Sequence, residues 1–274
     1  MSVNMSLPLQ LVVAFLTCFV IVSHSSSLNK VLFDGDYEFI DLTYPFDAET
    51  IYWPNTRSFE FTKKDEGYYE DGSWYAANEF AAGEHGGTHI DAPYHFDAQG
   101  KQVGDIPLEK LIVPLIIADI SSRVNDDPNF VLYKHHLDYL LNDNMGKPCV
   151  IVFKFGWSKF IRDKKKYLGL TDQNTLNFPG LSEEVAEWIT SSYKNVVGVG
   201  VDTASLDPGY STNFTVHKIL SKAGLYNLEN VKLDSDVPEY GCTAFVMPMK
   251  IRKGTGAPVR LAAVCPKRKL PDRF

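Results

Sequence analysis

The sequence predicts a single mixed α/β domain, and three observations indicate this class. Apolar stretches typical of buried strands alternate with helical stretches in the middle of the 274-residue chain. Stretches with the pattern of β-hairpins lie toward both ends. No internal repeat or low-complexity linker divides the chain, which is long enough to bury a sizeable core.

Strands are indicated by alternating polar and apolar residues, or by short apolar runs bounded by turn residues. In chain order, the predicted strands are residues 37–43, 59–62, 76–82, 115–120, 149–155 and 196–201. A polar hairpin connection joins the second and third, and the last three are apolar enough to be buried on both faces. Residues 243–250 and 258–264 flank a glycine-rich turn, which predicts a terminal β-hairpin.

Helical periodicity is clearest in residues 181–193. Ser182 is a candidate N-cap, because its hydroxyl can accept a hydrogen bond from an N–H group of the first turn. Acidic residues follow it, which favours the positive end of the helix dipole. Residues 133–141 and 214–222 are also predicted to be helical.

The first residues of the chain have the pattern of a secretory signal peptide. Residues 7–22 are almost uninterruptedly apolar, and small polar residues follow at 23–27. We therefore predict a signal peptide over residues 1–26 and a secreted mature domain over residues 27–274. A signal anchor is the alternative, because no Lys or Arg precedes the apolar run, although that run is shorter than the ~20 residues of a spanning helix. No stable membrane span is predicted for the mature chain.

The cysteines predict one disulfide bond. If Lys250 faces Ala257 across the terminal hairpin turn, stepping back eight residues on each strand places Cys242 opposite Cys265. Residues opposed on two strands lie ~4.5–5.5 Å apart, which is within disulfide reach. A Cys242–Cys265 bridge is therefore predicted, with Cys149 outside it.

Composition and charge exclude several classes of function. A net charge of −7 without a basic stripe argues against a nucleic-acid partner. The pair Gly198-x-Gly200 lacks a third glycine, so a dinucleotide site is not predicted. No nucleophile motif built on Ser or Cys is present.

One stretch, residues 84–96, concentrates three of the seven histidines. His85 and His89 are four residues apart, but adjacent glycines between them and a following proline oppose a zinc-binding helix. His89 and Asp91 are spaced to share one face of an extended segment. The glycines would let the backbone turn and bring His85 to the same point. Two imidazoles and a carboxylate that converge in this way are good ligands for a divalent cation.

The same stretch resembles the signature of the metal-dependent cyclase-family hydrolases, which include bacterial kynurenine formamidases and isatin hydrolases. The shared pattern His-x-Gly-Thr-His-x-Asp-x-Pro-x-His-Phe runs from His85 to Phe96 without departure. The resemblance extends over about residues 39–263 and is most specific here. It implies the family's swivelling β/β/α fold, a homodimer or higher homo-oligomer, and the activity of a metal-dependent amidohydrolase.

The resemblance also implies a complete ligand set. The family supplies a histidine and a glutamate twelve residues apart, and His217 and Glu229 have this spacing. The implied ligands of Zn or Mn, with one or two ions per chain, are His85, His89, Asp91, His217 and Glu229. In a two-metal site, Asp91 and Glu229 would bridge the ions. Without the resemblance, His217 would be interpreted as a structural histidine and Glu229 as an exposed acid.

Two further roles are implied by resemblance. His95 would lie near the metal but outside the ligand set, where an imidazole with a pKa near ~6.5 can act as general acid and base. Trp53 matches an aromatic residue that lines the family's substrate pocket, with a packing role as an equal alternative. Phe96 and Trp157 are candidate neighbours of that pocket.

These features predict a secreted metal-dependent hydrolase that cleaves the C–N bond of a small aromatic amide. The substrate would be an aryl formamide, as in the arylformamidases of tryptophan catabolism, or a cyclic amide such as isatin. The alternative is a catalytically inactive, secreted binding protein on the same fold. Family members that act on N-formylkynurenine are typically cytoplasmic, and the export signal departs from that setting.

Overall fold

The computed structural model describes residues 28–137, 147–172 and 175–267. The predicted signal peptide and its boundary lie outside these residues. The chain forms two units, of which the larger comprises residues 39–265. The smaller comprises the two ends of the chain, and its described part contains helix α2 (Leu28–Phe33). Within the described residues, no helix is both long and apolar enough to cross a bilayer.

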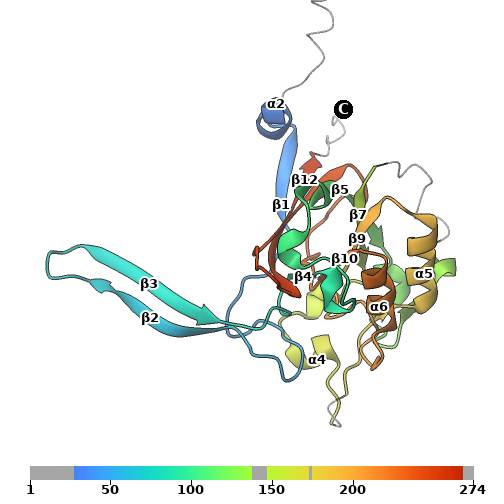
Figure 1. The fold of residues 1–274 in the computed structure, drawn as a ribbon, viewed down its shortest axis with the longest axis horizontal. Helices are drawn as coiled ribbons and strands as arrows, with labels where there is room; N and C mark the ends of the chain where they lie inside the picture. The colour runs from blue at the N-terminus through green and yellow to red at the C-terminus, as the bar shows by residue number, and fades with distance from the viewer. Residues whose placement is uncertain (1–27, 138–146, 173–174, 268–274) are drawn as a thin grey trace, which may run out of the picture. The chain divides into compact units, whose positions relative to one another are not determined.

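A mixed eight-stranded sheet organises the fold (Figure 1). Its strands are β1 (Tyr37–Asp41), β4 (His89–Asp91), β5 (Ile112–Asp119), β7 (Cys149–Lys154), β9 (Val196–Val201), β10 (Tyr226–Glu229), β11 (Cys242–Pro248) and β12 (Gly256–Pro266). They are arranged in the order β1-β12-β11-β5-β7-β9-β10-β4, and β12 also pairs with β4, so the sheet closes into a barrel. Strands β5, β7, β9 and β10 run parallel, whereas β4, β11 and β12 are antiparallel to their neighbours. The predicted mixed α/β class is confirmed.

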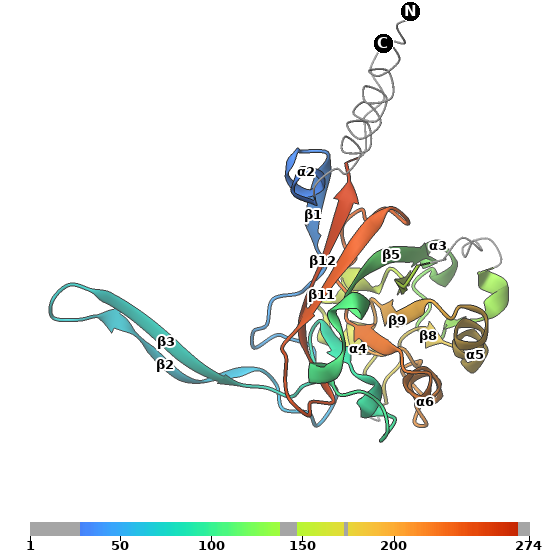
Figure 2. The same ribbon diagram turned by 45° about the horizontal axis from the view of Figure 1, so that its top comes forward.

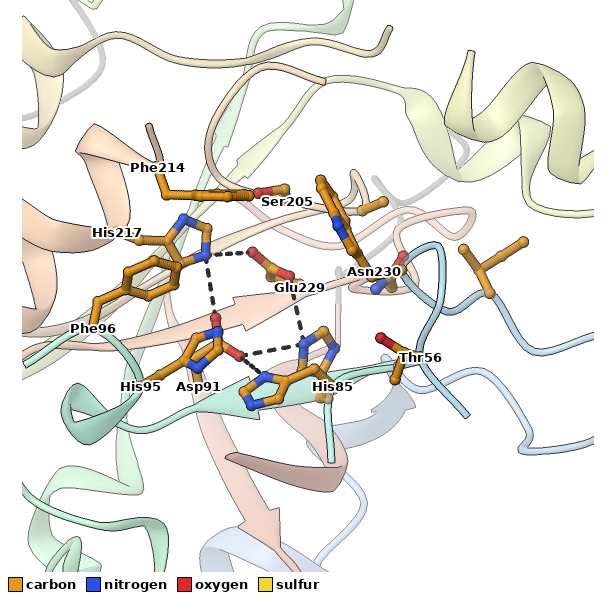
Figure 3. Close-up of a pocket in the computed structure, with 15 residues that line it drawn as sticks. Thr56, His85, Asp91, His95, Phe96, Ser205, Phe214, His217, Glu229 and Asn230 are labelled. Carbon is orange, nitrogen blue, oxygen red and sulfur yellow. Dashed lines mark hydrogen bonds and ion pairs between the residues drawn. The ribbon is translucent and has the colours of Figure 1, made fainter. Parts of the chain in front are cut away.

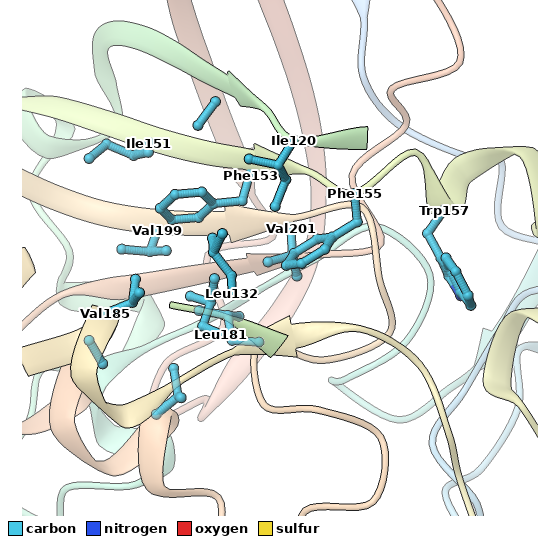
Figure 4. Packing of buried hydrophobic residues seen from close by; sticks show 14 of the residues in the cluster. Ile120, Leu132, Ile151, Phe153, Phe155, Trp157, Leu181, Val185, Val199 and Val201 are labelled. Carbon is cyan, nitrogen blue, oxygen red and sulfur yellow. The ribbon is translucent and has the colours of Figure 1, made fainter. Parts of the chain in front are cut away.

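Both faces of the central strands are buried, as their apolar sequences predict. On β7, Phe153 packs into the cluster that also contains the apolar sides of helices α5 (Glu183–Ser192) and α6 (Thr215–Lys222) (Figure 4). Its neighbour Val152 points the other way, into a second cluster inside the barrel. The two helices lie side by side against the sheet (Figure 2). Burying each large aliphatic side chain contributes about 1.5–3 kcal/mol.

The remaining elements are short. They are α3 (Ser121–Val124), α4 (Lys164–Leu168), β6 (Val131–Leu132), β8 (Gly180–Leu181), η1 (Pro93–His95), η2 (Val103–Asp105), η3 (Leu108–Lys110), η4 (Lys134–His136) and η5 (Trp157–Phe160). The predicted cap of α5 is confirmed, because the Ser182 hydroxyl accepts from the Val185 N–H at 3.2 Å. The helix predicted over residues 133–141 is only the single turn η4 in its described part, and residues 138–141 lie outside the described residues.

Strands β2 (Glu60–Tyr68) and β3 (Trp74–Ala81) form a separate two-stranded ribbon. It extends away from the barrel in both views (Figures 1 and 2). The strands are longer than the predicted ones, because polar and small residues in their outer halves gave no apolar pattern. Nearly every residue of the ribbon is exposed.

The terminal hairpin has the predicted register. Thr243 faces Val264 on the neighbouring strand, which places Cys242 opposite Cys265. The two cysteines are disulfide-bonded with their Cα atoms 4.2 Å apart, so the predicted bridge is confirmed. Cys149 lies outside the bridge, buried in β7.

Candidate metal centre and substrate pocket

The implied site residues come from three distant parts of the chain and meet at one pocket of about 280 Å³ (Figure 3). His89 and Asp91 lie on β4, and Glu229 lies opposite His89 at the end of β10. His217 lies in the first turns of α6. The pocket is lined by Ile51, Trp53, Thr56, His85, Gly86, His89, Asp91, His95, Phe96, Ala204, Ser205, Phe214, His217, Glu229 and Asn230.

The five implied ligands form two overlapping groups of donors. One contains His85, His89 and Asp91, and the other contains Asp91, His217 and Glu229. Within each group the donor atoms all lie within 4.8 Å of one another. Asp91 belongs to both, which is the arrangement expected of a bridging carboxylate. All of these residues except His85 are buried, so Glu229 is not the exposed acid that its local sequence indicated.

Hydrogen bonds fix which ring nitrogen each buried histidine presents. His89 Nδ1 lies 2.9 Å from the Gly87 carbonyl, which can only accept, so Nδ1 carries the proton. His217 Nδ1 likewise lies 2.6 Å from Asp207 Oδ2. Nε2 of each ring therefore faces the centre. Burial opposes protonation, but Asp91, Asp207 and Glu229 outweigh it and raise the pKa of both imidazoles, and a bound metal ion would take the place of the Nε2 proton. His89 Nε2 is 3.3 Å from Asp91 Oδ1, and His217 Nε2 is 3.0 Å from Glu229 Oε1.

Two buried atoms at the centre, His89 Nε2 and Asp91 Oδ2, make no hydrogen bond of good geometry among the described residues. They have ion-pair contacts at 3.3 Å, with Asp91 Oδ1 and His217 Nε2 respectively. Leaving a buried polar atom unsatisfied is costly. A cation between these atoms would satisfy both, and nitrogen and carboxylate donors together suit a divalent transition metal or zinc. The residues present therefore fit a divalent metal ion.

The charge on Asp91 also favours binding of a metal ion. Burial alone would raise the pKa of the Asp91 carboxyl, but the neighbouring rings of His85, His217 and His89 outweigh it and hold this pKa well below its usual value. Asp91 is thus ionised, as a metal ligand must be. The carboxylate and its surrounding imidazoles form a preorganised cation site.

His95 lies at the pocket wall but outside both donor groups. It ends η1, and its ring stacks on that of His85 with centroids 3.9 Å apart. Burial lowers the pKa of the His95 imidazole to about 4, against the opposing effect of Asp91. The ring is therefore neutral at pH 7 and able to accept a proton.

Aromatic side chains line the pocket beside the donors, and Phe96 and Phe214 both lie against the His217 ring. Trp53 lines the pocket and also packs edge-on against Phe178 and Phe214, at centroid distances of 6.4 and 5.8 Å. Pocket lining and packing were the two alternatives for this residue, and its position combines them. Phe96 lines the pocket as expected. Trp157 does not: it is buried elsewhere, with its Nε1–H donating to the Tyr167 carbonyl, so its predicted place near the pocket is wrong.

Three residues at the site received no role from the sequence. Phe214 adds a further aromatic face, and its position at the N-cap of α6 puts it three residues before His217. Asp207 accepts from His217 Nδ1 and from the backbone N–H groups of Val216 and His217. Asn230 donates through Nδ2 to the Gly87 carbonyl, the same atom that orients His89. The sequence indicated only that these side chains are aromatic, acidic or amide in type. Their spacing did not predict the contacts.

A barrel with a buried His, Asp and Glu donor set beside an aromatic pocket is the architecture of a hydrolytic enzyme with a site for a divalent metal ion. The chain belongs to the Cyclase family, because the sequence model of that family matches residues 40–208. The predicted family is thereby confirmed.

Two relatives that carry the names of hydrolytic enzymes confirm the predicted hydrolytic class, and a solved structure agrees with the fold. The chain is 28% identical to isatin hydrolase of Roseibium aggregatum over 260 residues, which cover 88% of this chain and 97% of that protein. It is also 28% identical to kynurenine formamidase of Bacillus cytotoxicus over 227 residues, 81% of this chain and 95% of that protein. The fold matches isatin hydrolase A from Ralstonia solanacearum with a TM-score of 0.77 at 24% identity, covering 96% of this chain and 100% of that one.

Proposed function

We propose that this chain is an exported, metal-dependent amidohydrolase that cleaves the C–N bond of a compact aromatic amide, either an aryl formamide or a cyclic amide. The observation that carries the proposal is a pocket lined both by a buried metal-donor set and by aromatic rings beside it. An inactive binding protein on the same fold would have no need of the buried donor set or the neutral His95 beside it.

The proposed ligands are His85, His89, Asp91, His217 and Glu229, which hold Zn or Mn as one or two ions. A bound ion of this kind supplies an activated water and polarises the scissile carbonyl, with zinc lowering the pKa of its water to ~7. Neutral His95 takes a proton from the attacking water and passes it to the leaving nitrogen. The half-buried side chains of Trp53, Phe96 and Phe214 hold the ring of the substrate.

The lining of the pocket favours an uncharged substrate. None of the described residues that line it is Lys or Arg. N-Formylkynurenine carries an ammonium and a carboxylate, which are costly to bury without a charged partner. A neutral cyclic amide such as isatin needs only aromatic contacts and the metal. Between the two substrate classes, the cyclic amide therefore fits the pocket better.

A side-by-side assay tests this choice. We expect Zn- or Mn-loaded enzyme to hydrolyse isatin with a higher kcat/KM than N-formylkynurenine. Trp53→Ala should raise KM for isatin by roughly 2- to 12-fold, the equivalent of an aromatic contact worth about 0.5–1.5 kcal/mol. The control is Trp188→Ala, since Trp188 lies on α5 outside the pocket. No activity on either compound, from protein that binds metal tightly, would favour the inactive binding protein or an unrelated amide.

Export is proposed from the N-terminal pattern of the sequence. The Cys242–Cys265 bridge supports it, because disulfide bonds persist mainly in oxidising compartments. The cytoplasmic setting typical of tryptophan catabolism would not favour such a bridge.

A homodimer is also proposed, with the β2–β3 ribbon at its interface. A lone two-stranded hairpin is marginally stable in water, and exposed apolar surface marks interaction sites. On this ribbon Phe61, Tyr68, Trp74 and Phe80 are 47%, 76%, 57% and 52% exposed. Ultracentrifugation should show a dimer that Tyr68→Ser with Trp74→Ser shifts toward monomer. The control Tyr210→Ser, at another exposed tyrosine, should leave the dimer intact. A monomeric wild type at micromolar concentration would contradict the proposal.

A further inference from the structure

We infer that Glu84 and Thr255 are positioning residues that engage Nε2 of His85, so that this ring presents Nδ1 to the metal centre. The inference rests on the proposed metal site but concerns two residues outside the ligand set. It also separates His85 from the other two histidines of the site.

A chain of hydrogen bonds connects the three side chains. The Thr255 hydroxyl lies 2.6 Å from Glu84 Oε2, and the Thr255 backbone N–H donates to the same oxygen at 2.9 Å. A carboxylate only accepts, so the hydroxyl proton points toward Glu84. The hydroxyl oxygen is then left to accept from His85 Nε2, which lies 2.8 Å away.

This direction of the hydrogen bonds decides which ring nitrogen faces the centre. With Nε2 engaged by Thr255, His85 presents Nδ1 to Asp91 Oδ1 at 2.6 Å, and because a carboxylate only accepts, Nδ1 carries a proton there that a bound metal ion would replace. His89 and His217 have the opposite arrangement, with Nδ1 donating to an oxygen and Nε2 directed inward. His85 differs from them in the ring nitrogen that faces the centre because it lies in the turn before β4, where its ring contacts the β11–β12 turn.

The glycine-rich β11–β12 turn fits closely around the two side chains. A Cβ atom at Gly256 would lie 2.6 Å from His85 Cε1, and one at Gly254 would lie 3.0 Å from Glu84 Oε1. Larger residues at these positions would displace the ring or the carboxylate. Because His95 stacks on His85, the same contacts also hold the proposed acid–base group in place.

The test compares two substitutions of Thr255 in the full mature protein. Thr255→Val keeps the shape but removes the hydroxyl, and should weaken Zn affinity about 10- to 100-fold in chelator competition, the usual effect of losing such a partner. Thr255→Ser keeps the hydroxyl and should remain near wild type. Thr190→Val, on the outer helix α5, is the control for loss of a threonine hydroxyl.

A second readout does not depend on metal binding. Nitrogen-15 NMR of the metal-free protein should show the Nε2–H of one site histidine in a hydrogen bond, assigned with His85→Ala, and Thr255→Val should shift this signal. Unchanged affinity and an unchanged Nε2–H signal in folded Thr255→Val would overturn the inference. If the wild type binds no metal while this signal shifts as expected, the proposed function fails and the positioning role stands.

Discussion

Replacing Asp91 by alanine should remove most of the bound metal, more completely than any change outside the donor set. Asp91 contributes to both donor groups, so its loss takes an oxygen ligand from each. It also leaves three buried or partly buried imidazoles without their common counter-charge. We expect metal affinity to fall by more than about 100-fold, beyond the range for outer partners of a metal site. His89→Ala should have a similar effect, and metal content per chain measures both.

The matched control for this experiment is Asp119→Ala. Asp119 is partly buried and paired with Lys154 at 2.8 Å, but it lies outside the pocket. Its substitution should leave metal content unchanged. If Asp91→Ala and His89→Ala both retained the metal content of the wild type, the assignment of the centre would be wrong.

His95→Asn should retain the metal and lose ~10²- to 10⁴-fold in kcat, the usual contribution of a positioned acid–base group. Metal binding should persist because His95 belongs to neither donor group. Burial lowers its pKa to about 4, so the neutral base is almost fully present from pH 8 to pH 6. The titration of His95 should therefore reduce the rate only as pH falls toward about 4, below the ordinary histidine range.

The control here is His135→Asn, because His135 is an exposed histidine on η4, far from the pocket lining. Both variants need measured kcat, KM and metal content. Near-normal turnover by metal-loaded His95→Asn would remove this residue from the mechanism.

The hydrophobic pattern of the local sequence was enough to predict the strands that are buried on both faces. Strands β7 and β9 are continuous apolar runs, and they form where the sequence indicates because both of their faces are buried. The short strand β10 was not predicted as a strand. It contains only four residues, two of them polar, and its Glu229 faces the metal centre rather than a core. A short strand whose side chains line a polar site has little hydrophobic periodicity, so its sequence does not predict it.

The ligands were identified by their resemblance to a family motif, whereas the residues that orient them were not. Thr255 acts on His85 across 170 positions of sequence, and Asn230 acts on the Gly87 carbonyl across 143. No periodicity relates residues so far apart, because only closure of the barrel brings them together. Asp207 is nearer to His217, but its role depends on a loop returning to the start of α6.

The place of β4 in the barrel ties the chemistry of the site to the integrity of the fold. This three-residue strand completes the ring, pairing with β10 on one side and β12 on the other. Because it is so short, it has few backbone hydrogen bonds to its neighbours, and it carries two of the proposed ligands. An ion bound between β4, β10 and α6 would hold the strand in the sheet, adding about 4 kcal/mol to folding stability when the free metal concentration is a thousand times its Kd. Binding of the ion and closure of the barrel would then stabilise each other.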